Sequence, residues 1–297
     1  MSATTAEGNN PAVLQPATET AAQARRETLR LILRSKTVWV GGLILAFWVL
    51  CALFGSHIAP HDAYQQNLLD HNARPSSAHW AGTDALGRDV FSRVIVGSRN
   101  ILLVAPLATL LGTILGTALG LTMGYFRGLT DDILSRMVEA VLALPLVIVA
   151  LTVLAATGTS NLTLVLVIGL VFAPIIARTV RAAVLSEREQ EYVTAAELRG
   201  EKAPYILFAE VLPNVLPPVL VEFTVRVGYA IFAVATLSFL GFGPQPPSPD
   251  WGAQINDAYA LISAGFWWES LGPAMAIASL VVAVNLIADG LQRAVTE

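Results

Sequence analysis

Six long apolar segments constrain this chain more than any other feature. Five of them carry no charged residue and occupy residues 38–54, 101–126, 140–156, 162–177 and 271–288, whereas the sixth, 215–242, includes Glu222 and Arg226. A hydrocarbon core about 30 Å thick is crossed by roughly 17–25 residues of helix, because backbone groups without partners are too costly in lipid. No segment shows the apolar and polar alternation of a membrane β-barrel strand. The sequence therefore predicts an all-α integral membrane protein with six transmembrane helices.

The positions of Lys and Arg predict the orientation, because these residues are enriched in cytoplasmic loops. The segment before the first span carries Arg25, Arg26, Arg30, Arg34 and Lys36. Basic residues recur after the second, fourth and sixth spans, and five of them lie between spans four and five. The loop after the first span also holds four Arg, but long loops translocate largely regardless of charge. We expect both termini to be cytoplasmic and this first loop to be extracytoplasmic.

These features divide the chain into four parts. Residues 1–24 are polar and lack bulky apolar groups, so we expect a disordered cytoplasmic tail. Residues 25–55 form the basic segment and the first span, and residues 56–100 form the extracytoplasmic loop. Residues 101–293 form the transmembrane core, which includes a long cytoplasmic loop at 185–213 between the fourth and fifth spans.

Several functions are disfavoured by motifs that the sequence lacks. It has no G-x-x-x-x-G-K-[ST] segment for ATP phosphates, no G-x-S-x-G elbow and no H-E-x-x-H pair. Its one cysteine, Cys51, excludes an internal disulfide and a cysteine-rich metal site. Only 13% of residues are charged and the net charge is -4, which gives no indication of a nucleic-acid partner. We expect no catalytic site and no cofactor bound by this chain.

The loop between spans four and five reads EREQEYVTAAELRGEKAPYILFAEVLPN over residues 187–214. Its first half is helix-forming, with Ala195 and Ala196 adjacent, and Gly200 fits a turn or C-cap. A second short helix is expected to end at residue 213, so the pattern predicts a helical hairpin. Small residues would let another protein approach the backbone, and the charges around them would offer pairing partners. An ordinary solvated loop is the alternative that the pattern leaves open.

Five residues of this loop follow a characteristic spacing. They are Ala195, Ala196, Gly200, Leu212 and Pro213. The spacing resembles the cytoplasmic signature of permease subunits of ATP-binding-cassette importers, which is Glu-Ala-Ala, three residues, Gly, nine residues, Ile, one residue and Leu-Pro. Thr194 replaces the signature Glu, and Glu210 stands at its Ile position. The resemblance implies that this loop, including Glu191 and Tyr192, couples the chain to ATPase subunits.

Three further segments are informative: HWAGTDALGRDVFSR at 79–93, LSFLGFGPQPPSPDWG at 237–252 and NLIADGLQ at 285–292. They resemble one branch of this family, the second permease of dipeptide and oligopeptide importers. The resemblance covers nearly the whole chain and implies a subunit of the bacterial inner membrane that imports peptides together with a second, homologous permease. It also implies two ATP-binding subunits that carry ATP and Mg, and an extracytoplasmic solute-binding protein. Importers of nickel and other small solutes share these segments, so the substrate class stays open, and a secondary transporter is the more distant alternative.

Four glycines recur every four residues in the second span. Gly112, Gly116, Gly120 and Gly124 therefore lie on one helix face, where a neighbouring helix can approach closely. Because glycine offers a solute no side-chain contact, we favour helix packing over the alternative of a pore lining.

The two charges of the fifth span are also spaced for contact. Glu222 and Arg226 are four residues apart, so they can pair along one helix face. Since an unpaired charge is costly in lipid, both side chains should face protein or water. The pair is either structural or part of the translocation path.

All four histidines lie in the first loop: His57, His61, His71 and His79. Together with Asp62 and Asp70 they raise the possibility of a metal site, because imidazole and carboxylate groups are common metal ligands. His79 already belongs to a family segment, and the other spacings cross a long loop. We therefore expect no metal site.

Overall fold

The computed structural model describes residues 35–296, and the predicted tail at 1–24 lies outside this range. Within it the long helices are α2 (Lys36–Ile58), α3 (Val90–Phe126), α6 (Asn161–Glu187), α9 (Leu212–Leu237) and α11 (Trp268–Thr296). The shorter helices are α4 (Gly128–Leu142), α5 (Leu146–Thr157), α7 (Glu191–Leu198), α8 (Ala203–Tyr205) and α10 (Trp251–Ala258). Two π-helical segments, η2 (Ile206–Val211) and η3 (Ser238–Phe242), flank α9, and two 3₁₀ segments are η1 (Leu68–Asp70) and η4 (Tyr259–Ala264).

Among residues 35–296, five helical stretches are long and apolar enough to cross a membrane. They are α2, α3, α6, α11 and a continuous stretch, Ala203–Phe242, that includes α9. A sixth span exists if α4 and α5, which are bent by 83° relative to each other, count as one. The predicted all-α membrane architecture is confirmed.

The apolar run predicted as the third span does not form one straight helix. α4 ends at Leu142 and α5 begins at Leu146, with Pro145 in an extended conformation as the N-cap of α5. A proline disfavours the helical conformation of the residue before it, which accounts for the break. The 12 residues of α5 extend only about 18 Å, well short of a hydrocarbon core of roughly 30 Å.

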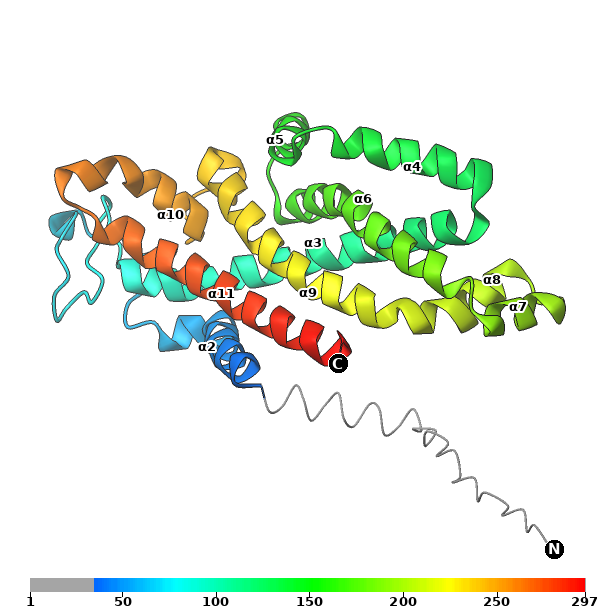
Figure 1. Ribbon diagram of the computed structural model, residues 1–297. Helices are drawn as coiled ribbons and strands as arrows, with labels where there is room; N and C mark the ends of the chain where they lie inside the picture. The colour runs from blue at the N-terminus through cyan, green and yellow to red at the C-terminus, as the bar shows by residue number, and fades with distance from the viewer. Residues whose placement is uncertain (1–34, 297) are drawn as a thin grey trace, which may run out of the picture.

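α3 lies at the centre of the bundle, where it contacts α2, α6 and α9, and α11 packs against α2 and α9 (Figure 1). Two irregular regions lie at opposite ends of the bundle. The loop end comprises residues 59–89, α10 and η4, and the hairpin end comprises α7, α8 and η2 (Figure 1). α3 connects them, because its first residue follows the long loop and its last turn lies near the hairpin.

The most extensive helix contact is between α3 and α6, and the four regularly spaced glycines of α3 lie in it. A Cβ atom on Gly116 would lie 2.7 Å from the Ala173 carbonyl oxygen and 2.7 Å from the Ile176 Cβ. At Gly120 it would lie 2.6 Å from the Val180 Cβ. Gly112 and Gly124 likewise face α6 backbone or side-chain atoms. No side chain larger than hydrogen fits at these positions without moving the two helices apart.

We predict that Gly116→Ala lowers stability, because the added methyl group meets a carbonyl oxygen and a Cβ on α6. Such overpacking typically costs about 1–3 kcal/mol. The matched control is Gly42→Ala in α2, where a Cβ meets nothing within 4 Å and helix propensity improves by up to about 1 kcal/mol. Thermal unfolding of both variants in detergent measures the difference, and equal melting temperatures would contradict the prediction.

Candidate functional site

The hairpin end is organised by the turn at Gly200. Its φ is +77°, a left-handed conformation that glycine adopts without strain. The Gly200 N–H donates to the Glu197 carbonyl at 2.9 Å, and the Glu201 N–H donates to the Ala196 carbonyl at 3.2 Å. These two bonds and the left-handed glycine form a Schellman motif, which ends α7 and reverses the chain.

α7 has one anchored face and one open face. Val193 and Ala196 are buried, whereas Glu191 and Ala195 are exposed, and Leu198 is 84% exposed. The two adjacent alanines therefore lie in different environments, one against the bundle and one facing outward.

Tyr192 fixes the other end of α7. Its hydroxyl donates to Glu187 Oε2, at the end of α6, at 2.8 Å. Burial and this hydrogen bond raise the pKa of Tyr192 to about 12, so the hydroxyl remains a donor. α7 is thereby tied to α6.

The second arm of the hairpin does not end at Leu212 and Pro213, in contrast to the prediction. Helix continues from Ala203 through η2 and α9 to Phe242, and Pro213 lies in the first turn of α9. A proline lacks an N–H and its ring clashes with the carbonyl four residues earlier, and the wider π-helical turn of η2 directly before it relieves this conflict. The second arm is therefore the beginning of a membrane-spanning helix.

Glu222 and Arg226 form an ion pair in the middle of α9. Arg226 Nε donates to Glu222 Oε1 at 2.6 Å, and the side chains are 19% and 14% exposed for Arg226 and Glu222 respectively. The guanidinium carbon also lies 5.2 Å from the centre of the Tyr229 ring. Arg226 lines a cavity of about 230 Å³ between α5, α6 and α9, whose other walls are apolar and include Phe172 and Phe232. Each charge is thus compensated within the chain, next to an apolar space.

A second ion pair was not anticipated from the sequence. Arg181 Nε and Nη2 donate to the two carboxylate oxygens of Asp131, both at 2.6 Å, and join α6 to α4. Arg181 had been placed in a cytoplasmic loop, but α6 continues through Glu187. No local pattern indicates this pair, because the two residues are 50 positions apart.

Two family-like segments meet at the loop end, those containing Arg93 and Trp251. Arg93 Nη2 donates to the Ser248 carbonyl at 3.4 Å. The Trp251 indole donates to the Val94 carbonyl at 2.8 Å, and the tryptophan is buried. The first turns of α3 are thus held against the segment at 248–251.

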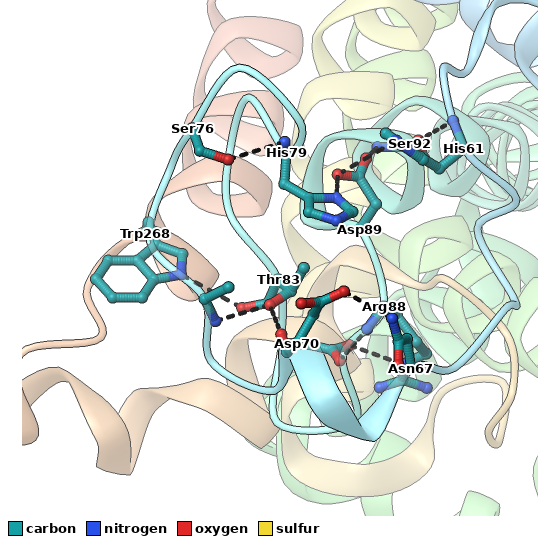
Figure 2. Close-up of polar contacts among 12 residues, drawn as sticks. His61, Asn67, Asp70, Ser76, His79, Thr83, Arg88, Asp89, Ser92 and Trp268 are labelled. Carbon is teal, nitrogen blue, oxygen red and sulfur yellow. Dashed lines mark hydrogen bonds and ion pairs between the residues drawn. The ribbon is translucent and has the colours of Figure 1, made fainter.

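The loop end also brings together side chains that are far apart in the sequence (Figure 2). The Trp268 indole donates to the Thr83 carbonyl at 3.3 Å. His79 Nδ1 lies 2.8 Å from Asp89 Oδ1, and His61 Nδ1 lies 3.7 Å from the same oxygen. Asp89 is a different carboxylate from the two considered in the sequence, and only the folded loop brings it next to the histidines.

Comparisons with known proteins agree with this arrangement. Residues 116–297 match the family described as binding-protein-dependent transport system inner membrane component, and residues 24–75 match the N-terminal TM domain of oligopeptide transport permease C. The chain is 36% identical over 269 residues to the dipeptide transport system permease protein of Bacillus subtilis, covering 91% of this chain and 84% of that protein. It is also 36% identical over 273 residues to the glutathione transport system permease protein of Pectobacterium atrosepticum, covering 91% and 89%.

The chain belongs to the permease subunits of ATP-binding-cassette importers. Within them it belongs to the dipeptide and oligopeptide branch, as the segments at 79–93, 237–252 and 285–292 predicted. The permease is therefore a multi-pass protein of the inner membrane, and its long apolar helices are membrane spans.

We predict that Glu222→Gln harms the permease more than the double variant Glu222→Gln with Arg226→Gln. The single variant leaves an unpaired arginine, which costs about 2.5–3.5 kcal/mol near a span centre on insertion scales. The amount of folded permease in membranes measures the effect. The control is Glu189→Gln, because Glu189 is 72% exposed in its pair with Arg127 and such a surface pair contributes only about 0–1 kcal/mol. Purely additive losses at Glu222 and Arg226 would argue against coupling.

Proposed function

We propose that this permease imports short peptides, and that it forms the translocation path together with a second, homologous permease. Two ATP-binding subunits dock on its cytoplasmic side, and an extracytoplasmic solute-binding protein delivers peptide to the loop end. The substrate class rests on the relatives, whose names specify dipeptides and glutathione. ATP and Mg are bound by the partner subunits, and this chain binds neither.

The observation that carries the coupling role is that α7, which has an exposed face, lies directly before a membrane-spanning helix in the chain. Ala195 is exposed on α7, and the Schellman turn at Gly200 is followed, after two non-helical residues, by the membrane-spanning stretch Ala203–Phe242. A partner that contacts Ala195 can approach the α7 backbone closely, because the side chain of Ala195 is only a methyl group. A displacement of α7 is then passed into α9, which carries Glu222 and Arg226.

A second connection transmits the same displacement to α6. The Tyr192–Glu187 hydrogen bond links α7 to the end of α6. At the turn, Arg199 Nε donates to Glu201 Oε1 at 2.8 Å, which stiffens the chain between the two arms. When the ATPase subunits close on ATP, the hairpin moves α6 and α9 together and switches the path from inward-facing to outward-facing. The free energy comes from the partner subunits, and no bond is made or broken in this chain.

The ion pair in α9 is the part of this chain that we propose lies on the path. A peptide in transit carries an ammonium group and a carboxylate, and each can be complemented by one member of the pair. Arg226 already lines the cavity between α5, α6 and α9. When no peptide is present, the opposite charges of Glu222 and Arg226 compensate each other, so neither side chain is a lone charge in lipid.

We predict that Ala195→Trp reduces ATPase binding and ATP-dependent dipeptide uptake at least tenfold while the permease still inserts and folds. The bulky ring covers the open face of α7 without changing its backbone, whereas a substitution at Gly200 also disturbs the turn. Uptake by membrane vesicles and co-purification of the ATPase subunits measure the effect. The control is Ala260→Trp at the loop end, which is also exposed and should leave ATPase binding unchanged. Full uptake with intact ATPase binding in Ala195→Trp would overturn the coupling assignment.

Orientation can be tested independently, because the two ends of the bundle must face opposite sides of the membrane. In a Cys51→Ser background, Ser77→Cys at the loop end should react with a membrane-impermeant thiol reagent from outside. Lys202→Cys at the hairpin end should react only after the membrane is permeabilised. Both positions are exposed, so access to the thiol depends on the side of the membrane. The reverse pattern would show that the proposed topology is inverted.

A further inference from the structure

Three potential metal ligands converge at the loop end, next to the beginning of α3. They are His61, His79 and Asp89, and their ligand atoms all lie within 4.8 Å of one another. The two imidazole rings are 4.7 Å apart between centres. Figure 2 shows the His79 ring directed at the Asp89 carboxylate, with His61 beside Ser92. We propose that these three side chains bind one divalent transition-metal ion on the loop end of the permease.

The ligands are held in place by bonds that do not require an ion. Asp89 is the N-cap of α3, and its Oδ2 accepts the Ser92 N–H at 2.8 Å, which leaves Oδ1 facing the histidines. The Ser92 hydroxyl in turn accepts the backbone N–H of His61 at 3.1 Å. The backbone N–H of His79 donates to the Ser76 hydroxyl at 3.2 Å. Preorganised ligands of this kind lose little freedom when an ion binds.

The spacing suits a tetrahedral ion. Ligand bonds of about 2.0–2.1 Å around a tetrahedral centre place the ligand atoms roughly 3.3 Å apart. The two distances to Asp89 Oδ1, 2.8 Å from His79 and 3.7 Å from His61, lie on either side of that value. Small side-chain rotations would bring both nitrogens into place.

The ligand chemistry restricts which ion can bind. Two imidazole nitrogens and one carboxylate oxygen suit Zn²⁺, Co²⁺, Ni²⁺ or Cu²⁺, whereas Mg²⁺ and Ca²⁺ prefer oxygen ligands alone. The side chain of Asp89 is 1% exposed, but that of His61 is 42% exposed. An ion can therefore reach the site from the solvent on the His61 side, and a fourth position remains for water.

His61 distinguishes a metal site from a simple structural contact. The hydrogen bond between His79 and Asp89 would stabilise the start of α3 without any ion. The His61 ring, however, lies 3.7 Å from Asp89, beyond hydrogen-bond distance, and contacts the His79 ring instead. A metal ion would give His61 a role, because the ion would bind His61, His79 and Asp89 together at the start of α3.

The experiment uses the full-length permease, purified through a tag that contains no histidine. After equilibration with Zn²⁺ and removal of free ion, the wild type should retain one equivalent per chain, and Co²⁺ in its place should give the visible absorption of a tetrahedral complex. His61→Ala should weaken binding by more than the roughly 10- to 100-fold that loss of an outer-shell partner costs. It should also abolish the rise in melting temperature that Zn²⁺ gives to the wild type, because an ion that binds only the folded state stabilises it.

The matched control is His57→Ala, another exposed histidine, which lies in the last turn of α2. It should bind Zn²⁺ like the wild type. Because His61→Ala keeps the His79–Asp89 contact and loses only a ring contact of a 42% exposed side chain, its melting temperature without Zn²⁺ should stay close to that of the wild type, which separates loss of ligand from loss of fold. Equal Zn²⁺ retention by the wild type and His61→Ala, or no retained ion in the wild type, would overturn the proposal.

Discussion

The close approach of α3 and α6 is the contact on which the rest of this permease depends. In lipid the hydrophobic effect does not drive helices together, so association relies on close packing and on interhelical bonds. The glycine face of α3 supplies the packing, and the bidentate bond between Arg181 and Asp131 adds a polar contact nearby. α3 runs from the loop end to the hairpin end, and α6 packs along its second half.

At the hairpin end, the last turns of α3 and α6 are joined directly. Arg188, just after α6, donates to the Tyr125 carbonyl near the end of α3, and Glu187 accepts the Tyr192 hydroxyl. At the loop end, α3 begins with Asp89 as its cap and is bound through Val94 to Trp251. α3, with α6 packed along its second half, therefore sets the positions of the hairpin end and of the loop end, as the proposed coupling requires.

Features that depend on neighbouring residues could be predicted from the sequence. Five of the six apolar runs predicted a membrane-spanning helix, the spacing of Glu222 and Arg226 predicted their contact along one helix, and Gly200 predicted the end of α7. Features that depend on the folded chain could not be predicted. Asp131 and Arg181 come from different helices, and Asp89 meets His61 and His79 only because the long loop folds back on the start of α3. The residues of these two groups have no regular spacing in the sequence, so only tertiary packing brings them together.

Pro145 and Pro213 show that proline, which disfavours a continuous helix, can end a helix at one position and leave it continuous at another. Both Pro145 and Pro213 directly follow a leucine, yet the helix breaks at the first and continues at the second. At Pro145 the preceding helix α4 is only partly packed, so the chain bends by 83° and nothing opposes the break. Before Pro213, Ile206 and Val211 are buried in the core, and keeping them there favours a continuous helix with a π-helical turn over a break. Burial of neighbouring side chains thus decides whether a proline ends a helix or only widens it, and a single sequence does not reveal that burial.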